Sequence, residues 1–429
     1  MPEYPQVFCL RQHFERPRVA NVAEAVAAEL ATLALETKIR PGQSVAITAG
    51  SRGIANIAVI IRTIAEQLRK LGARPFIVPA MGSHAGGTAE GQRRLIEDYG
   101  ITEAFCGCPI RSSMETVVVC QAREGFPVHF DRLAYEADHV VVCGRVKPHT
   151  SFAGDIESGL MKMMLIGLGK HQGAKIYHRA ILDYNFDQII RSVAREVVAR
   201  CRIVAGLAVL ENGYDETARI AAVRPEDFEA REKELLVLAK QWLPRLPFDE
   251  ADLLLIDELG KDISGTGLDT NVVGRKFARH EPGPGETPRI RHLAVRALTP
   301  KTRGNATGLG LAEFCRSRVL RERDEAITRV NSCTGNDVCA AMTPLDYETD
   351  REILDTALPL IGLTEPADAR LLWIRNTLQV EHVVCSRAYW PAAQQRADLE
   401  ILSPLQSLPW DAAGNLPDRV TSLMAAAAG

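Results

Sequence analysis

The chain has 429 residues, with 51 basic and 54 acidic side chains and 46% hydrophobic residues, a composition typical of a folded protein of two or three domains. Its formal net charge of −3 argues against nucleic-acid binding, which needs a basic surface to displace counterions. No stretch approaches the roughly 18–20 consecutive apolar residues of a membrane span, and residues 1–9 do not have the basic and apolar regions of a signal peptide. We therefore expect a cytoplasmic protein that binds neither nucleic acid nor membrane.

The ten cysteines are scattered along the chain, and none of them forms a Cys-x-x-Cys pair. A zinc or iron–sulfur site built from four cysteines needs such closely spaced pairs, so we do not expect one. Most of the cysteines are predicted to be buried thiols in a reducing compartment.

Apolar runs alternate with helical stretches along the chain, which is the pattern of an α/β fold. The first half predicts strands at 44–49, 74–80, 116–120, 139–146 and 203–210, and helices at 22–37, 54–71, 89–98, 185–200 and 225–242. Glycine-containing turns directly follow the first two of these strands. Ligands of open α/β sheets bind at the carboxyl ends of strands, so both turns are candidate ligand loops.

The segment 243–248 is the best candidate for a linker, because Pro244 and Pro247 interrupt any helix or strand there. A new strand–turn–helix series opens after it at 252–256. We therefore predict two α/β domains, residues 1–248 and 249–429, with the active-site cleft between them. The segment 281–288 holds three prolines and two glycines and is expected to be a surface loop.

The most informative segment is 144–179, which places His149, Lys162, His171 and His178 among small and apolar neighbours. Pro148 restrains the backbone just before His149. Glycines at positions 154, 159, 167, 169 and 173 allow the backbone to approach a ligand closely. The alternative interpretation is a loop with solvated charges, whose histidines bind backbone carbonyl groups.

This segment resembles the nickel-pincer-nucleotide enzymes of the lactate racemase (LarA) family. In that family a Pro-His pair precedes a glycine-rich run that ends in a lysine, and a histidine follows sixteen positions later; here these are His149, Lys162 and His178. The Ser51-Arg52 pair after the first strand and the Gly-Ser-His sequence that ends at His84 agree with two further family motifs in the same order.

The resemblance implies a role for each of these residues. Lys162 would hold the cofactor, a pyridinium mononucleotide with thiocarboxyl groups, and His178 would be the protein ligand of its nickel ion. His84 and His149 would be the two catalytic bases, one on each face of the substrate. Arg52 would bind the substrate carboxylate. The resemblance also implies cofactor-biosynthesis enzymes as partners and a 2-hydroxy acid as substrate.

The remaining residues implied by the resemblance bind the same two ligands. Arg52 would also contact the cofactor together with Ser51, and an Asp-x-Asn turn of the second domain would add Asp269 and Asn271. Lys276 would join Arg52 in binding the substrate.

The chemistry is consistent with these residue types. The Cα–H of a 2-hydroxy acid is not acidic enough to leave easily as a proton, whereas hydride loss gives a planar 2-oxo acid whose configuration can invert. Such a site needs a hydride acceptor from a cofactor and a base for the hydroxyl proton, and imidazole suits that task near pH 7. Sulfur donors with one imidazole favour nickel over magnesium or calcium.

Two departures from the family lie near Lys162. The interval from His149 to Lys162 is a few residues longer, and it contains Asp155 and Glu157, which either lie in a solvated loop or contact a different substrate. His171 is an alternative nickel ligand to His178, although the spacing favours His178.

Further departures lie in the second domain, where the tyrosine and glutamine that follow the Asp-x-Asn turn in lactate racemases are replaced by Val273 and Gly274. The lost tyrosine predicts more volume beside the reacting carbon. Arg275, Lys276 or Lys261 would then bind a second carboxylate or a polyol chain. We therefore expect racemisation or epimerisation of a 2-hydroxy acid larger than lactate, such as a hydroxy diacid, an aryl-substituted acid or a sugar acid.

Three functions from other classes remain open on the sequence. A zinc-dependent hydrolase would use His84, His149 and His178 as metal ligands. A non-catalytic relative would bind the cofactor without exchanging substrate hydrogen. An acyl- or phosphoryl-transferring enzyme would bind phosphate at a helix N-terminus, but neither a P-loop motif nor a strand-linked dinucleotide-binding motif occurs.

Overall fold

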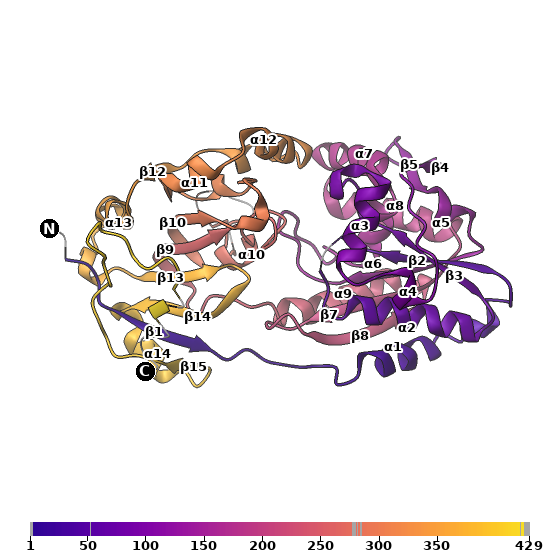
Figure 1. Cartoon of the computed structure of the whole chain (residues 1–429), viewed down its shortest axis with the longest axis horizontal. Helices are drawn as coiled ribbons and strands as arrows, with labels where there is room; N and C mark the ends of the chain where they lie inside the picture. Colours follow the sequence, from indigo (N-terminus) through magenta and orange to yellow (C-terminus); the bar gives the residue numbers. More distant parts are fainter. Residues whose placement is uncertain are drawn as a thin grey trace. The chain divides into compact units, whose positions relative to one another are not determined.

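The computed structural model describes residues 3–51, 53–276, 280, 282–283, 285–420 and 422–423. The chain forms two compact units (Figure 1). One is Glu15–Leu243, here called the N-terminal domain, and the other combines Pro244–Gly429 with Met1–Phe14 and is called the C-terminal domain. Each contains a mainly parallel sheet with helices, so the predicted class of two α/β domains is confirmed.

The sheet of the N-terminal domain has the strand order β3-β2-β6-β7-β8. The strands are β2 (Ser44–Ala49), β3 (Arg74–Pro79), β6 (His139–Arg145), β7 (Ile203–Glu211) and β8 (Thr217–Val223). The first four are parallel and β8 is antiparallel to β7. The chain passes from β2 to β3 on one side and returns to β6 on the other, so the sheet has its topological switch point between β2 and β6.

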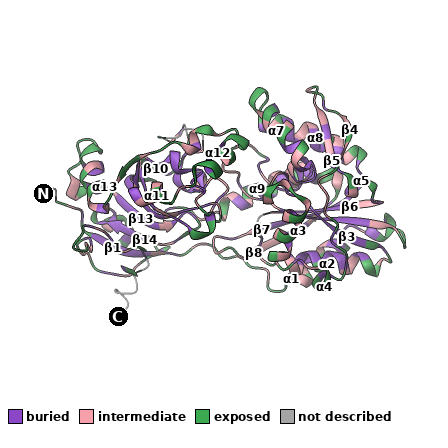
Figure 2. Cartoon of the chain, turned by 45° about the horizontal axis from the view of Figure 1, so that its top comes forward, coloured by how far each residue is buried: buried purple, intermediate pink, exposed green. Residues whose placement is uncertain are grey.

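Helices cover both faces of this sheet, so its strands are buried on both sides. Val45 and Ile47 of β2 face a core formed with α1 (Val22–Ala31) and α2 (Ile57–Lys70). Ala46 faces the opposite core, to which α7 (Lys170–Asp183), α8 (Phe186–Arg200) and α9 (Phe228–Gln241) contribute. Figure 2 shows the strands as buried and the helices with exposed outer faces.

Smaller elements complete the N-terminal domain. The predicted strand at 116–120 is present, but it lies outside the main sheet, in an antiparallel pair formed by β4 (Thr116–Gln121) and β5 (Pro127–Asp131). The short helices are α3 (Ala89–Asp98), α4 (Glu103–Cys106), α5 (Arg132–Glu136) and α6 (Leu160–Lys162), and α6 continues into a π-helical turn, Met163–Gly167.

The C-terminal domain has an eight-stranded sheet of order β12-β11-β10-β9-β13-β14-β1-β15. Its strands are β1 (Val7–Gln12), β9 (Glu250–Leu259), β10 (Arg289–Leu298), β11 (Phe314–Arg316), β12 (Leu345–Tyr347), β13 (Leu371–Asn376), β14 (Gln379–Ser386) and β15 (Leu399–Ile401). Its helices are α10 (Thr270–Val273), α11 (Ser317–Glu322), α12 (Glu325–Thr334), α13 (Asp350–Ala357) and α14 (Trp390–Gln395).

The domain limits differ from the predicted ranges 1–248 and 249–429 at both ends of the first domain. Strand β1 pairs antiparallel with β14 and with β15, so the N-terminal segment belongs to the C-terminal sheet. The second limit falls between Leu243 and Pro244, at the start of the proline-containing segment. The surface-loop prediction for 281–288 includes Glu281 and Pro284, which lie outside the described residues.

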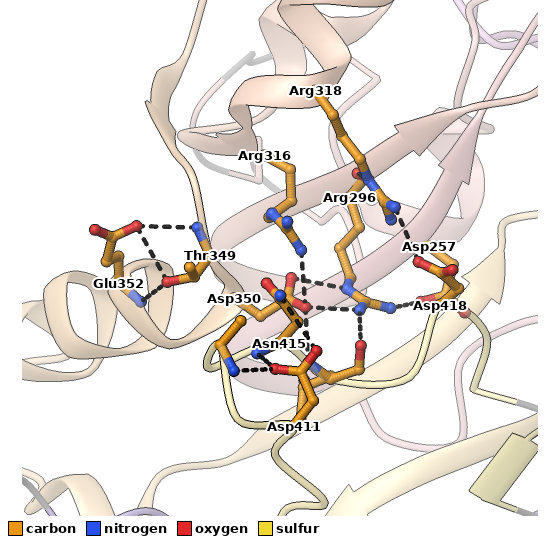
Figure 3. Close-up of polar contacts among 12 residues, drawn as sticks. Asp257, Arg296, Arg316, Arg318, Thr349, Asp350, Glu352, Asp411, Asn415 and Asp418 are labelled. Carbon is orange, nitrogen blue, oxygen red and sulfur yellow. Dashed lines mark hydrogen bonds and ion pairs between the residues drawn. The ribbon is translucent and has the colours of Figure 1, made fainter.

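A buried arginine links several elements of the C-terminal domain (Figure 3). The Arg296 guanidinium donates to Asp257 at 2.5 Å and to Asp350 at 3.0 and 2.7 Å, and none of these three side chains is more than 2% exposed. It also donates to the carbonyl oxygen of Leu416 at 3.0 Å. The pairing satisfies charges that would otherwise be costly to bury, and it joins β9, β10 and α13 to the C-terminal segment.

Most of the ten cysteines are buried and all are free thiols, as predicted. Within the described part of the chain, no helix is both long enough and apolar enough to cross a membrane.

Candidate active site

Three loops of the N-terminal domain begin where β2, β3 and β6 end. They carry Ser51, His84 and His149, respectively. Because these strands are parallel neighbours, their carboxyl ends meet at one edge of the sheet, beside the switch point between β2 and β6. This is the position at which ligands bind in open α/β sheets.

The first two loops are in direct contact. Ser51 Oγ and His84 Nδ1 form a hydrogen bond although the residues are 33 positions apart. The Tyr99 hydroxyl holds the first loop by donating to the Ser51 carbonyl oxygen at 2.8 Å, and the buried Gln92 amide holds the second by donating to the Gly82 carbonyl oxygen at 2.9 Å. The structure therefore brings Ser51 and His84 together, whereas Arg52 lies outside the described residues.

His149 is held through both its backbone and its ring. Its backbone N–H donates to Glu157 Oε2 at 2.7 Å, and its ring Nδ1 accepts from the Ser151 N–H at 2.9 Å. The ring stacks on Phe152 with centroids 4.4 Å apart, and Phe152 stacks on Phe186 of α8 at 4.2 Å. Because Nδ1 accepts a hydrogen bond, the neutral His149 ring carries its proton on Nε2.

Lys162 ends α6, and the π-helical turn that follows packs against the β2 and β3 loops. Gly82 has a φ of +60°, and a Cβ there would lie 3.1 Å from Ile166. A Cβ on Gly50 would lie 3.0 Å from the Met163 methyl group. The glycines of both turns therefore allow the helical segment with Lys162 to approach the loops of Ser51 and His84 closely.

His178 lies on α7 near Lys162. Burial lowers the pKa of His178, and the positive charge of Lys162 lowers this pKa further. Both effects favour neutral imidazole at neutral pH, which is the form that binds a metal ion. Lys162 therefore lies close enough to His178 for its charge to act on the ring.

His171 lies seven residues before His178 on the same face of α7, about two helical turns away. Burial, followed by the charge of Lys175, lowers the pKa of His171. Its Nδ1 is buried without a hydrogen-bond partner among the described residues. His171 therefore stays an alternative metal ligand to His178.

The two carboxylates between His149 and Lys162 are both paired inside the N-terminal domain. Lys233, at 2.8 Å, and Arg191 lower the pKa of Asp155 to about 2. Glu157 is fully buried and pairs with Lys240 of α9 at 2.5 Å. Glu157 therefore belongs to the packed interior of the domain, and Asp155 is engaged by two cations.

The candidate residues of the C-terminal domain form a turn at the start of α10. Asp269 caps this helix, and its Oδ1 accepts from the backbone N–H of Asn271 at 3.0 Å and from the Asn271 amide at 2.9 Å. The backbone N–H of Asp269 donates to the Thr377 hydroxyl oxygen at 2.8 Å. The Asp-x-Asn pair is thus a hydrogen-bonded turn.

The residues after this turn, Val273 and Arg275, do not face a substrate as the sequence suggested. Val273 is fully buried in the core of the C-terminal domain. The guanidinium of Arg275 is also buried, where it donates to the carbonyl oxygens of Leu311 and Ile290 and pairs with Glu313 at 2.7 Å. The prediction that Arg275 binds a second substrate carboxylate is therefore wrong, because its donors are used in packing.

Lys276 and Lys261 are the other cations that the sequence singled out in this domain. The Lys276 backbone N–H donates to Glu286 at 2.8 Å, and the Lys261 ammonium donates to the Gly265 carbonyl oxygen. Both side chains are half-buried.

No group of three or more histidine, cysteine, aspartate or glutamate side chains within the described ranges is arranged to hold a metal ion. A zinc hydrolase needs about three such ligands, so these residues do not provide the site that this alternative requires. A metal held mainly by a cofactor needs only one of them.

Two buried charged residues of this region were not identified from the sequence. Lys170 precedes His171, has a φ of +54°, and pairs fully buried with Asp131 at 2.9 Å while donating to the Pro79 carbonyl oxygen at 2.5 Å. Glu232 lies in the apolar series of α9, on the buried face with Phe228, Leu235 and Leu236. A carboxylate at a core position of an amphipathic helix was the available signal for Glu232.

Comparison with known proteins agrees with this geometry. Residues 9–188 match the family described as the lactate racemase N-terminal domain, a range that includes Ser51, His84, His149, Lys162 and His178. A solved structure, the lactate racemase apoprotein from Thermoanaerobacterium thermosaccharolyticum, is similar with a TM-score of 0.55 and 14% identity over 86% of this chain and 93% of that chain. No curated protein matches the chain. The chain is thus a two-domain α/β protein with a fold similar to that of the lactate racemase apoprotein. Residues 9–188 thus form a domain of the lactate racemase N-terminal type, as the sequence motifs indicated.

Proposed function

We propose that this protein is a racemase or epimerase of a 2-hydroxy acid larger than lactate and that it uses a nickel-pincer nucleotide. The observation that carries the proposal is the arrangement of the N-terminal domain, in which the segment with Lys162 and the neutral His178 packs against the loops of Ser51 and His84. The match of residues 9–188 to the lactate racemase N-terminal domain supports the reaction class.

The described residues fit this cofactor. A nickel ion whose other ligands come from the cofactor needs a single neutral imidazole, and His178 provides one beside the amine of Lys162. Ser51, Arg52, Asp269 and Asn271 are the proposed contacts for the rest of the nucleotide. When bound, the cofactor supplies the hydride acceptor.

The histidines would move the hydroxyl proton. The Ser51 hydroxyl accepts a hydrogen bond as readily as it donates one, so His84 can carry its proton on Nδ1 and use Nε2 as a base. His149 presents Nε2–H while Ser151 donates to its Nδ1, and it accepts a proton on Nε2 only after that contact is exchanged. Arg52 and Lys276 are the proposed contacts of the substrate carboxylate and of its remaining polar groups.

The size of the substrate is inferred from Val273 and Gly274, which stand where lactate racemases have a tyrosine and a glutamine. Neither residue offers a hydroxyl or an amide to a small substrate. Lys276 is the cation of this segment that we assign to a larger, polar acid.

A panel of 2-hydroxy acids tests the proposal. Protein produced with the cofactor-building enzymes is expected to contain about one nickel ion, to carry a mass shift on Lys162 peptides and to invert a larger acid faster than lactate, measured by chiral chromatography. Inversion of lactate at least as fast as every larger acid would refute the size argument. If loaded protein inverts none of them, it is a non-catalytic cofactor-binding relative.

A further inference from the structure

We propose that Glu157 is a positioning residue that fixes His149 at the carboxyl edge of the sheet. This inference rests on the proposed function, because it concerns the histidine assigned there to proton transfer. Glu157 lies in the interval between His149 and Lys162, which is longer here than in lactate racemases, so the proposal also assigns a role to this longer interval.

The loop with His149 is closed around the Glu157 carboxylate. The Lys147 N–H donates to the Ser158 carbonyl oxygen at 3.1 Å, which joins the two ends of the loop. Inside it, Glu157 Oε2 accepts from the His149 N–H at 2.7 Å, and Oε1 accepts from the Gly154 N–H at 3.3 Å. Both oxygens of one side chain therefore hold the backbone of the loop.

The same carboxylate joins the loop to the body of the domain. Lys240 of α9 lies 2.5 Å from Glu157 Oε1 and also donates to the Gly154 carbonyl oxygen at 3.0 Å. The Glu157 side chain is completely buried, whereas that of Lys240 is 40% exposed. A buried carboxylate is retained only when it is paired and hydrogen-bonded, and hydrogen bonds to a charged acceptor are the stronger ones.

The backbone position of His149 determines where its ring lies. With the backbone held, the ring is placed by the Ser151 N–H and by the stack on Phe152 and Phe186. Without Glu157 the loop keeps its second attachment through Asp155, so the domain stays folded while the His149 backbone loses its acceptor. Catalytic groups displaced by about 1 Å can lose on the order of 100-fold in rate.

Three variants of the full-length chain separate these roles. Glu157→Ala removes both functions of the carboxylate, whereas Glu157→Gln keeps an oxygen that accepts from the His149 N–H. Asp155→Asn is the matched control, because it weakens ion pairs of the same loop without touching His149.

The first readout needs no cofactor. In ¹⁵N-histidine NMR spectra of the protein without cofactor, the His149 signals, assigned with His149→Ala, are expected to show the Nε2–H tautomer in the wild type and in Asp155→Asn. Glu157→Ala is expected to give the averaged signals of exchanging tautomers, and Glu157→Gln is expected to restore the wild-type pattern. Unchanged His149 signals in Glu157→Ala would overturn the proposal. If Glu157→Ala does not fold, Lys240→Met tests the same point, because it withdraws the cation that holds the carboxylate.

The second readout is kinetic and is made on loaded protein. Glu157→Ala is expected to lower kcat about 100-fold with KM and nickel content nearly unchanged, and Glu157→Gln to lower it less than 10-fold. Equal losses in Glu157→Ala and Asp155→Asn would contradict a role through His149. A wild-type protein without turnover whose His149 signals still respond to Glu157→Ala would refute the proposed function and leave the positioning role intact.

Discussion

Glu232 is expected to make the stability of the N-terminal domain depend on pH. Glu232 lies on α9 and is 1% exposed. Its Oε2 accepts a hydrogen bond at 3.0 Å from the backbone N–H of Met161, the residue before Lys162. Its Oε1 has no hydrogen-bond partner within the described residues. Gly159 leaves room for this carboxyl, since a Cβ there would lie 2.5 Å from Glu232 Cδ. Burial raises the pKa of Glu232 from 4.5 to about 7.

The sign and size of the effect follow from this shift. Between pH 4.5 and pH 7 the folded protein keeps a proton on Glu232 that the unfolded chain releases. The stability contributed by this proton is fully present below pH 4.5 and is lost as the pH rises to about 7. At about 1.4 kcal/mol per pKa unit, the loss between pH 5 and pH 8 is roughly 2 to 3 kcal/mol.

Glu232→Gln removes the titration with little change of shape, so the variant should gain roughly 2 to 3 kcal/mol relative to the wild type between pH 5 and pH 8. Urea unfolding of both proteins at several pH values measures this difference. The fluorescence of Trp242, the only tryptophan among residues 15–243, reports the N-terminal domain. Parallel stability curves for the two proteins over this pH range would refute the reasoning.

Three further changes test the buried pairs and the metal ligand. Lys170→Met leaves Asp131 buried without its cation and should destabilise the N-terminal domain by about 3–5 kcal/mol in urea unfolding; a loss below 1 kcal/mol would contradict the burial. Arg296→Met leaves the buried Asp257 without its cation and Asp350 with Arg316 as its remaining cation, so it should lower the melting temperature of the C-terminal domain in calorimetry. An unchanged transition would speak against the network. His178→Ala should lose nickel by elemental analysis while His171→Ala keeps it, and the opposite result would exchange the two assignments.

The sequence by itself determined the α/β class, the main strands of the N-terminal domain and the resemblance of residues 9–188 to the lactate racemase N-terminal domain. Strands such as β2 and β6 could be predicted because a short apolar run followed by a glycine or proline is a local signal. The spacing between Lys162 and His178 could likewise be recognised from the sequence, because the two residues lie only sixteen positions apart, in the successive helices α6 and α7.

Contacts between distant parts of the chain were decided only by the tertiary structure. Strand β1 pairs with β14, more than 370 positions away, and the local sequence VFCLRQ does not indicate which strand it pairs with. From the sequence alone, Glu157 is one of several charged residues of a loop, whereas in the structure it is buried and pairs with Lys240. Likewise, the sequence suggests Arg275 as a cation for the substrate, whereas in the structure its guanidinium donates to backbone carbonyl oxygens. The physical reason is the same in each case: whether a charged group is solvated or paired depends on which elements pack over it, and that packing is set by the whole fold.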